Sequence, residues 1–243
     1  WSDGVILSTT DGGDNWVPDY HTGKLIKSFV FIDDDLGYWL SRCGSETQIN
    51  KTTSGGNSWL EVFSSGWWAI DSLGYNIEGN EIGFIDETTG FVVGRYIDSS
   101  DVWGAGILYT TDSGINWDLG WQYPDTNDLW YNLNSITSID TTCWAVGEVG
   151  MIVKYTPLTG WVKQTSVINL PLNKVFFSDD NHGWIAGGYQ NDDGFQKILL
   201  RTTNSGVNWN TVPNIPYLFR DFVFIDNSLG WAIGYTQTGT GGI

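Results

Sequence analysis

The sequence predicts an all-β protein built from repeated four-stranded units. Three observations support this prediction: a short motif ending in Trp returns along the chain, a second motif precedes it, and each repeat contains four short strand signals. The repeats recur about every 47 residues, which is typical of propeller blades rather than of helical solenoids. We therefore expect a β-propeller with four strands in each blade.

The first motif is a turn, called the box below. It reads Thr-Thr-Asp-Gly-Gly-Asp-Asn-Trp at 9–16 and returns with small changes at 52–59, 110–117 and 202–209. A decayed copy at 155–161 keeps only its final Gly-Trp. Short polar side chains can bond backbone groups two residues on, Gly supplies positive φ, and Trp anchors the next strand. We assign this structural role to Asp11, Gly13, Trp16, Ser54, Gly56, Trp59, Asp112, Gly114, Trp117, Asn204, Gly206 and Trp209.

The second motif is an apolar strand, an acidic turn, a small residue and an aromatic strand. Its copies are 31–39, 84–94, 138–147, 177–187 and 224–234. In the first complete repeat, the two motifs predict strands near 27–33, 37–43, 48–53 and 58–63. The repeats are expected at 19–63, 64–122, 123–165, 166–212, and 213–243 together with 1–18.

The two ends of the chain each carry half a blade. Strands are expected near 219–226 and 229–235 at one end, and near 4–10 and 15–18 at the other. A single domain over 1–243 follows, with five blades and the last blade shared between the termini, because such closure removes open sheet edges. The alternatives are a fragment of a seven- or eight-bladed ring, and half-blades that pair between chains into a head-to-tail polymer. We expect a monomer.

These motifs resemble the Asp-box, or bacterial neuraminidase repeat. Combined with the Phe-x-Asp and Gly-Trp-Ala-x-Gly segments, as in 224–234, they are most similar to photosystem II stability/assembly factor-like repeat proteins. The resemblance extends over nearly the whole chain and implies a propeller. It does not imply one function, because Asp-box propellers include sialidases, xyloglucan hydrolases, sorting receptors and surface proteins.

The composition restricts the class of partner. Eleven Lys and Arg stand against 28 Asp and Glu, giving a net charge of −17. Phosphates would be repelled, so neither nucleic acid nor an anionic membrane surface is expected as a partner. No apolar run reaches the roughly 20 residues of a membrane-spanning helix, so no membrane insertion is expected. The low charge density and the Asp bias favour an extracellular or cell-surface protein, with the periplasm as the alternative.

Catalysis and metal binding have weak sequence support. Four arginines, scattered at Arg42, Arg95, Arg201 and Arg220, do not form a sialidase start motif, and no carboxylate pair stands out. The acidic clusters 33–35, 179–180 and 192–193 lack the spacing of a calcium loop and are interpreted as solvated turns. His21 and His182 lack partners at metal-ligand spacing, and His182 is expected to be exposed. We expect no enzyme activity, cofactor or metal, with a sialidase-like or xyloglucanase-like glycoside hydrolase as the alternative.

The tryptophans divide into two groups. Those that fit the repeat are interpreted as core residues: Trp16, Trp59, Trp117, Trp144, Trp161, Trp184, Trp209 and Trp231. Five others lie in insertions that break the period: Trp67, Trp68, Trp103, Trp121 and Trp130. Loop aromatics on a rigid scaffold can stack on sugar rings or on a protein partner, although the same residues could plug a channel or pack between blades. We expect these five to bind a glycan or a protein.

The two cysteines, Cys43 and Cys143, occupy different positions in repeats that lie two apart. A disulfide is therefore not expected, because it requires close approach of the two Cα atoms. Two buried thiols are the expected state.

Overall fold

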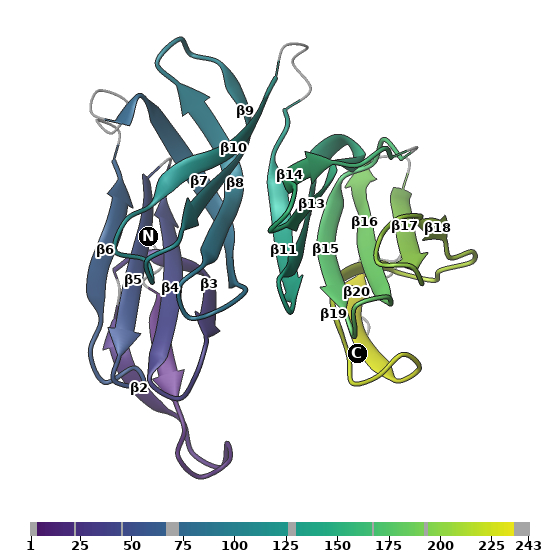
Figure 1. The fold of residues 1–243 in the computed structure, drawn as a ribbon. Helices are drawn as coiled ribbons and strands as arrows, with labels where there is room; N and C mark the ends of the chain where they lie inside the picture. Colours follow the sequence, from purple (N-terminus) through teal and green to yellow (C-terminus); the bar gives the residue numbers. More distant parts are fainter. Residues whose placement is uncertain are drawn as a thin grey trace. The chain divides into compact units, whose positions relative to one another are not determined.

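The computed structural model describes residues 4–21, 23–44, 46–66, 73–125, 130–166, 168–191 and 194–235. The chain divides into two compact units, Trp1–Gln122 and Tyr123–Ile243, and each is described by itself. The boundary between the expected second and third repeats coincides with the boundary between the units. Both units are built from antiparallel β-sheets (Figure 1).

The first unit contains one two-stranded and two four-stranded sheets. The small sheet pairs β1 (Val5–Ser8) with β2 (Val17–His21). The other two sheets are meanders, in which each strand pairs with the next along the chain. Their strands are β3 (Leu25–Phe31), β4 (Leu36–Cys43), β5 (Glu46–Thr53) and β6 (Leu60–Ser65), then β7 (Tyr75–Phe84), β8 (Gly90–Asp98), β9 (Trp103–Thr110) and β10 (Asp118–Pro124).

The second unit has the same composition of sheets. Its four-stranded meanders consist of β11 (Leu133–Ile139), β12 (Thr142–Gly147), β13 (Ile152–Thr156) and β14 (Gly160–Lys163), then β15 (Leu172–Phe177), β16 (Gly183–Asn191), β17 (Gly194–Thr202) and β18 (Asn210–Thr211). The two-stranded sheet pairs β19 (Leu218–Phe224) with β20 (Gly230–Tyr235). A four-stranded meander is the blade of a propeller, so the predicted all-β blade architecture is confirmed. The two small sheets together contain the four strands that one shared blade requires.

An aspartate shapes the turn between the first two strands of a blade. Oδ1 of Asp33 accepts hydrogen bonds from the backbone N–H groups of Asp35 (2.8 Å) and Leu36 (2.6 Å). Asp86, Asp179 and Asp226 make the same pair of bonds to the residues two and three positions on. Much of the acidic composition therefore serves turn formation.

Side chains on facing sheets form the core within each unit. In the first unit, Tyr38 of β4 stacks on Phe84 of β7, with ring centroids 4.3 Å apart. In the second unit, Trp144 of β12 stacks on Phe177 of β15 at 3.7 Å. In each unit the two four-stranded sheets thus pack through aromatic residues at the same two positions of the repeat.

Two of the repeat tryptophans are not core residues, which corrects the prediction. Trp16 is 58% exposed and Trp231 is 56% exposed, whereas Trp184, at the same repeat position as Trp231, is buried. Trp16 directly precedes β2, and Trp231 lies on β20. Both therefore belong to two-stranded sheets, which have no further strands of their own to cover an aromatic side chain.

Two smaller expectations also need correction. Both cysteines are free, but Cys43, at the end of β4, is exposed, and only Cys143 is buried. His182 is partly buried rather than exposed, because its Nδ1 lies 2.9 Å from both carboxylate oxygens of Asp179. Within the described residues, no helix is long and apolar enough to cross a membrane.

Candidate functional site

The box is a closed hydrogen-bonded turn that uses its own polar groups. Oγ1 of Thr110 accepts from the N–H of Gly114 (2.9 Å), and Oδ1 of Asp112 accepts from the N–H of Asn116 (2.9 Å). The boxes at 9–16 and 202–209 make equivalent bonds, and in the box at 52–59 the Ser54 hydroxyl replaces the carboxylate. The box threonines also accept from the backbone N–H two residues on, as predicted, and the bonds to groups four residues on are additional. The box oxygens are thus engaged in the turn.

The box carboxylates remain ionised to low pH. Hydrogen bonds from the backbone and side chain of Asn116 lower the pKa of Asp112 to about 2. Hydrogen bonds from the side chain and backbone of Asn15 lower that of Asp11 to about 2. A glycosidase acid needs a raised carboxyl pKa, so these groups are poorly suited to that role.

A cluster of charged side chains lies at one end of the two blades of the first unit. Glu78 of β7 accepts a hydrogen bond from Arg95 of β8 at 3.0 Å, and Nη1 of Arg42, on β4, lies 3.7 Å from the same Oε2. Arg42 also donates to Oδ1 of Asn80 at 3.2 Å. All three charged side chains are largely buried, and Glu78 is 15% exposed, so the bonds hold both guanidinium groups in place.

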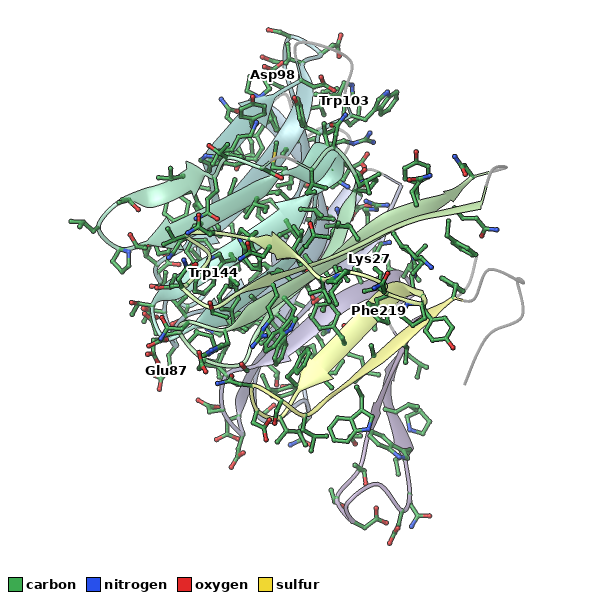
Figure 2. All side chains as sticks on the ribbon, turned by 90° about the vertical axis from the view of Figure 1, so that its right-hand side faces the viewer. Lys27, Glu87, Asp98, Trp103, Trp144 and Phe219 are labelled. Carbon is green, nitrogen blue, oxygen red and sulfur yellow. The ribbon has the colours of Figure 1, made fainter. Side chains whose placement is uncertain are left out.

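Trp103 completes this cluster, which we call the Arg95–Trp103 site. Cζ of Arg95 lies 4.3 Å from the centroid of the Trp103 ring, a cation–π distance. Trp103 begins β9 and pairs with Ile97 of β8; Trp103 and Asp98, the last residue of β8, lie at the same end of this hairpin (Figure 2). Oδ1 of Asp98 accepts from the N–H of Val102 at 3.0 Å and closes the hairpin.

Several cationic side chains lie close together at this site of a strongly acidic protein. Arg42 and Arg95 both lie within ion-pair distance of Oε2 of Glu78. Lys27 of β3 is close enough to Arg42 to be affected by its charge: partial loss of hydration lowers the pKa of Lys27, and the Arg42 charge lowers it further. An acidic group of a ligand would therefore be attracted here.

The five inserted tryptophans have different positions. Trp103 is half-buried at the site described above, and Trp121 is half-buried on β10. Trp130 is 70% exposed, has a φ of 56°, and donates its backbone N–H to Oδ2 of Asp125. Trp67 and Trp68 lie outside the described residues. Trp103 is thus placed in a charged cluster.

A smaller aromatic cluster lies in the second unit, next to Trp130 in sequence. The rings of Tyr123 and Tyr131 meet edge to face with centroids 5.0 Å apart. Nζ of Lys163 lies 3.9 Å from the centroid of the Tyr123 ring and 5.6 Å from that of Tyr131. The lysine is thereby held against the aromatic pair.

Sequence reasoning missed the arginines, although the repeat contained a signal for them. Arg42 and Arg95 were interpreted as scattered, yet both stand five residues after the small residue, Gly37 or Gly90, that opens the second strand of a blade. Glu148 occupies the same position in the third repeat. Identical repeat positions in neighbouring blades can converge, and here they meet on Glu78.

Among the described residues, no group of three or more His, Cys, Asp or Glu side chains could hold a metal ion. The clusters at 33–35 and 179–180 contain the turn aspartates Asp33 and Asp179, whose oxygens accept backbone hydrogen bonds. Asp192 and Asp193 lie outside the described residues.

Comparisons with known proteins identify the fold. No protein-family model matches the chain, and no curated protein matches its sequence. Among solved structures, a GH74 xyloglucanase from Xanthomonas campestris is similar with a TM-score of 0.64 at 12% identity, over 96% of this chain and 40% of that one. A PL25 ulvan lyase has a TM-score of 0.53 at 9% identity, over 97% of this chain and 70% of the lyase.

A third similar structure is that of YCF48 bound to D1 peptide. It has a TM-score of 0.45 at 18% identity. The match extends over 96% of this chain and 84% of that one. The chain spans less than half of the xyloglucanase. At these identities the xyloglucanase and lyase matches show the fold alone, a β-propeller as the repeats predict.

Proposed function

We propose that this protein is a non-catalytic, extracellular or cell-surface binding module, and that the Arg95–Trp103 site contacts its partner. The partner is a glycan or a protein segment that presents an acidic group beside a ring or other flat apolar surface. Trp103 supplies the flat surface, and the two arginines supply positively charged hydrogen-bond donors.

The observation that carries this proposal is the fixed position of Arg95. Its guanidinium is held between the carboxylate of Glu78 and the ring of Trp103, so little side-chain entropy remains to be lost on binding. A pre-positioned guanidinium beside an aromatic ring, at the end of a sheet, is typical of a recognition surface.

The alternative is a glycoside hydrolase of the same fold. Its general acid would need a carboxyl group with a raised pKa. Each described carboxyl whose pKa departs from its ordinary value is shifted downwards, because it accepts turn hydrogen bonds; these are Asp11, Asp33, Asp86, Asp112, Asp179 and Asp226. These shifts favour binding over catalysis.

A glycan array that includes acidic glycans, together with an array of acidic peptides, tests the proposal. We expect Trp103→Ala and Arg95→Ala to lower the affinity for the captured ligand at least tenfold, with unfolding midpoints close to that of the wild type. Arg201→Ala is the matched control: its guanidinium also lies over a Trp ring, 5.7 Å from the centroid of Trp184, but in the second unit.

Two outcomes would contradict the proposal. If the Trp103 and Arg201 variants bind the ligand equally well, the Arg95–Trp103 site does not contact it. Turnover of chromogenic glycosides by the wild type would support the hydrolase instead. Recovery from the culture medium or the cell surface, rather than from the cytosol, tests the location.

A further inference from the structure

The second unit contains a cavity that the first unit fills with apolar side chains. The two units pack their blade pairs in the same way, so equivalent positions can be compared. In the first unit, Nζ of Lys51 donates to the backbone oxygen of Ser113 at 2.8 Å; in the second, Nζ of Lys154 donates to that of Ser205 at 2.8 Å. Both serines stand in a box, at the same place.

The outer strands of the first unit bring two apolar side chains to this contact. Phe63 of β6 pairs with Ile49 of β5, and Leu119 of β10 follows its box by two residues. Both pack against the buried cluster that contains Ile49 and Leu108. The space between the outer strands of this blade pair is therefore occupied by hydrocarbon.

The same two positions are polar in the second unit. Gln164 follows β14 and donates its N–H to the oxygen of Ile152, which is the residue equivalent to Ile49. Thr211 of β18 pairs with Leu200 and follows its box by two residues, as Leu119 does. Gln164 and Thr211 are smaller than Phe63 and Leu119, and they line a cavity of about 650 Å³.

The lining of the cavity indicates what it would bind. It contains no charged side chain, although the protein carries a net charge of −17. Ile152, Leu200 and Trp209 supply apolar surface, and Gln164, Asn208 and Thr211 are among the polar groups. Its volume is within the usual range of small-ligand pockets, roughly 300–1,000 Å³.

One polar atom in the lining needs a donor. Oε1 of Gln164 is buried and accepts no hydrogen bond from the described residues. Burial without a partner is unfavourable for a carbonyl oxygen, so the Gln164 side chain would gain a hydrogen bond by turning toward a hydroxyl donor in the cavity. A neutral sugar has both hydroxyl donors and an apolar ring face that can lie on Trp209 or on the aliphatic side chains.

We infer that this cavity, between β13–β14 and the 204–211 segment, binds a neutral hexose unit of an oligosaccharide. This site shares no residue with the Arg95–Trp103 site, and its ligand differs in charge. The inference is therefore independent of the proposed function.

The test is titration calorimetry with cellotetraose and maltotetraose as neutral probes and tetragalacturonic acid as the charged one. We expect a neutral tetrasaccharide to bind, and the acidic one to bind at least tenfold more weakly. Gln164→Phe together with Thr211→Leu introduces the side chains of the first unit, and we expect it to fill the cavity and reduce neutral binding at least tenfold.

Controls separate loss of the site from loss of the fold. Gln196→Phe places the same ring at an exposed position on β17 and should bind as the wild type does. Gln164→Leu removes the acceptor with little change in size, and serves as the second test if the double variant unfolds. Absence of binding by both neutral probes, or unchanged neutral binding after filling the cavity, would overturn the inference.

Discussion

The box at 202–209, in which Thr202 and Gly206 are buried, allows a quantitative test of how the repeat is stabilised, by the change Thr202→Val. Oγ1 of Thr202 accepts from the N–H groups of Gly206 (3.0 Å) and Asn204 (3.3 Å), and it donates to Oδ1 of Asn204 at 3.0 Å. Both Thr202 and Gly206 are buried. Valine preserves the shape of the side chain but removes the acceptor.

The expected cost follows from the group left behind. Without Oγ1, the buried N–H of Gly206 has lost its acceptor, and a buried unsatisfied group costs about 1–3 kcal/mol. We expect the free energy of unfolding to fall by about 2 kcal/mol. In a protein of this size, that corresponds to a decrease of about 4–8 °C in the midpoint of thermal unfolding.

The exposed box at 9–16 provides the matched control, Thr9→Val. Thr9 makes the same three bonds, including 3.0 Å to the N–H of Gly13, but this turn is largely solvent-accessible. Water can replace the hydroxyl, so we expect a loss of about 0.5 kcal/mol or less. Urea and thermal denaturation, followed by circular dichroism, measure both variants. An equal loss in the two variants, or a larger one for Thr9, would refute the argument from burial.

The remaining predictions concern a carboxylate, the thiols and a close backbone contact. Because the pKa of folded Asp112 is lowered to about 2, its stabilising effect is complete above the unfolded value near 3.8 and is lost as the pH falls toward 2; in urea titrations at several pH values, the advantage of the wild type over Asp112→Asn should disappear over that window. A thiol reagent should modify Cys43 in the native protein and Cys143 only after denaturation, because burial raises the pKa of the Cys143 thiol and limits access to it. In Gly94→Ala the new Cβ would lie 2.1 Å from a backbone oxygen of the neighbouring strand, so we expect a loss of about 3 kcal/mol in unfolding free energy, whereas Gly66→Ala, with open space around it, should lose much less.

Much of the blade was predictable because its signals are local. The box residues bond one another within eight positions, as Thr110, Asp112 and Asn116 do, so the motif contains both the donors and the acceptors of its turn. Strand positions followed from the same local patterns: the strand expected near 37–43 is β4, Leu36–Cys43.

The environment of individual side chains was less predictable. Trp184 and Trp231 occupy one repeat position, each as the second residue of its strand, yet the first is buried and the second is exposed. The difference depends on how many strands accompany each sheet, which the sequence around a tryptophan does not specify. Cys43 was assigned to the interior for a similar reason, and it lies instead at the exposed end of its strand.

The sequence by itself determined the repeat, the four-stranded blade and the turn chemistry, because those depend on contacts between residues close in the chain. Only the tertiary structure decided which side chains form sites. Arg42, Glu78 and Arg95 come from three strands and meet because neighbouring blades are packed together. Likewise, Gln164 and Thr211 are unremarkable in the sequence, and they line a cavity because two outer strands, far apart in the chain, face each other across it.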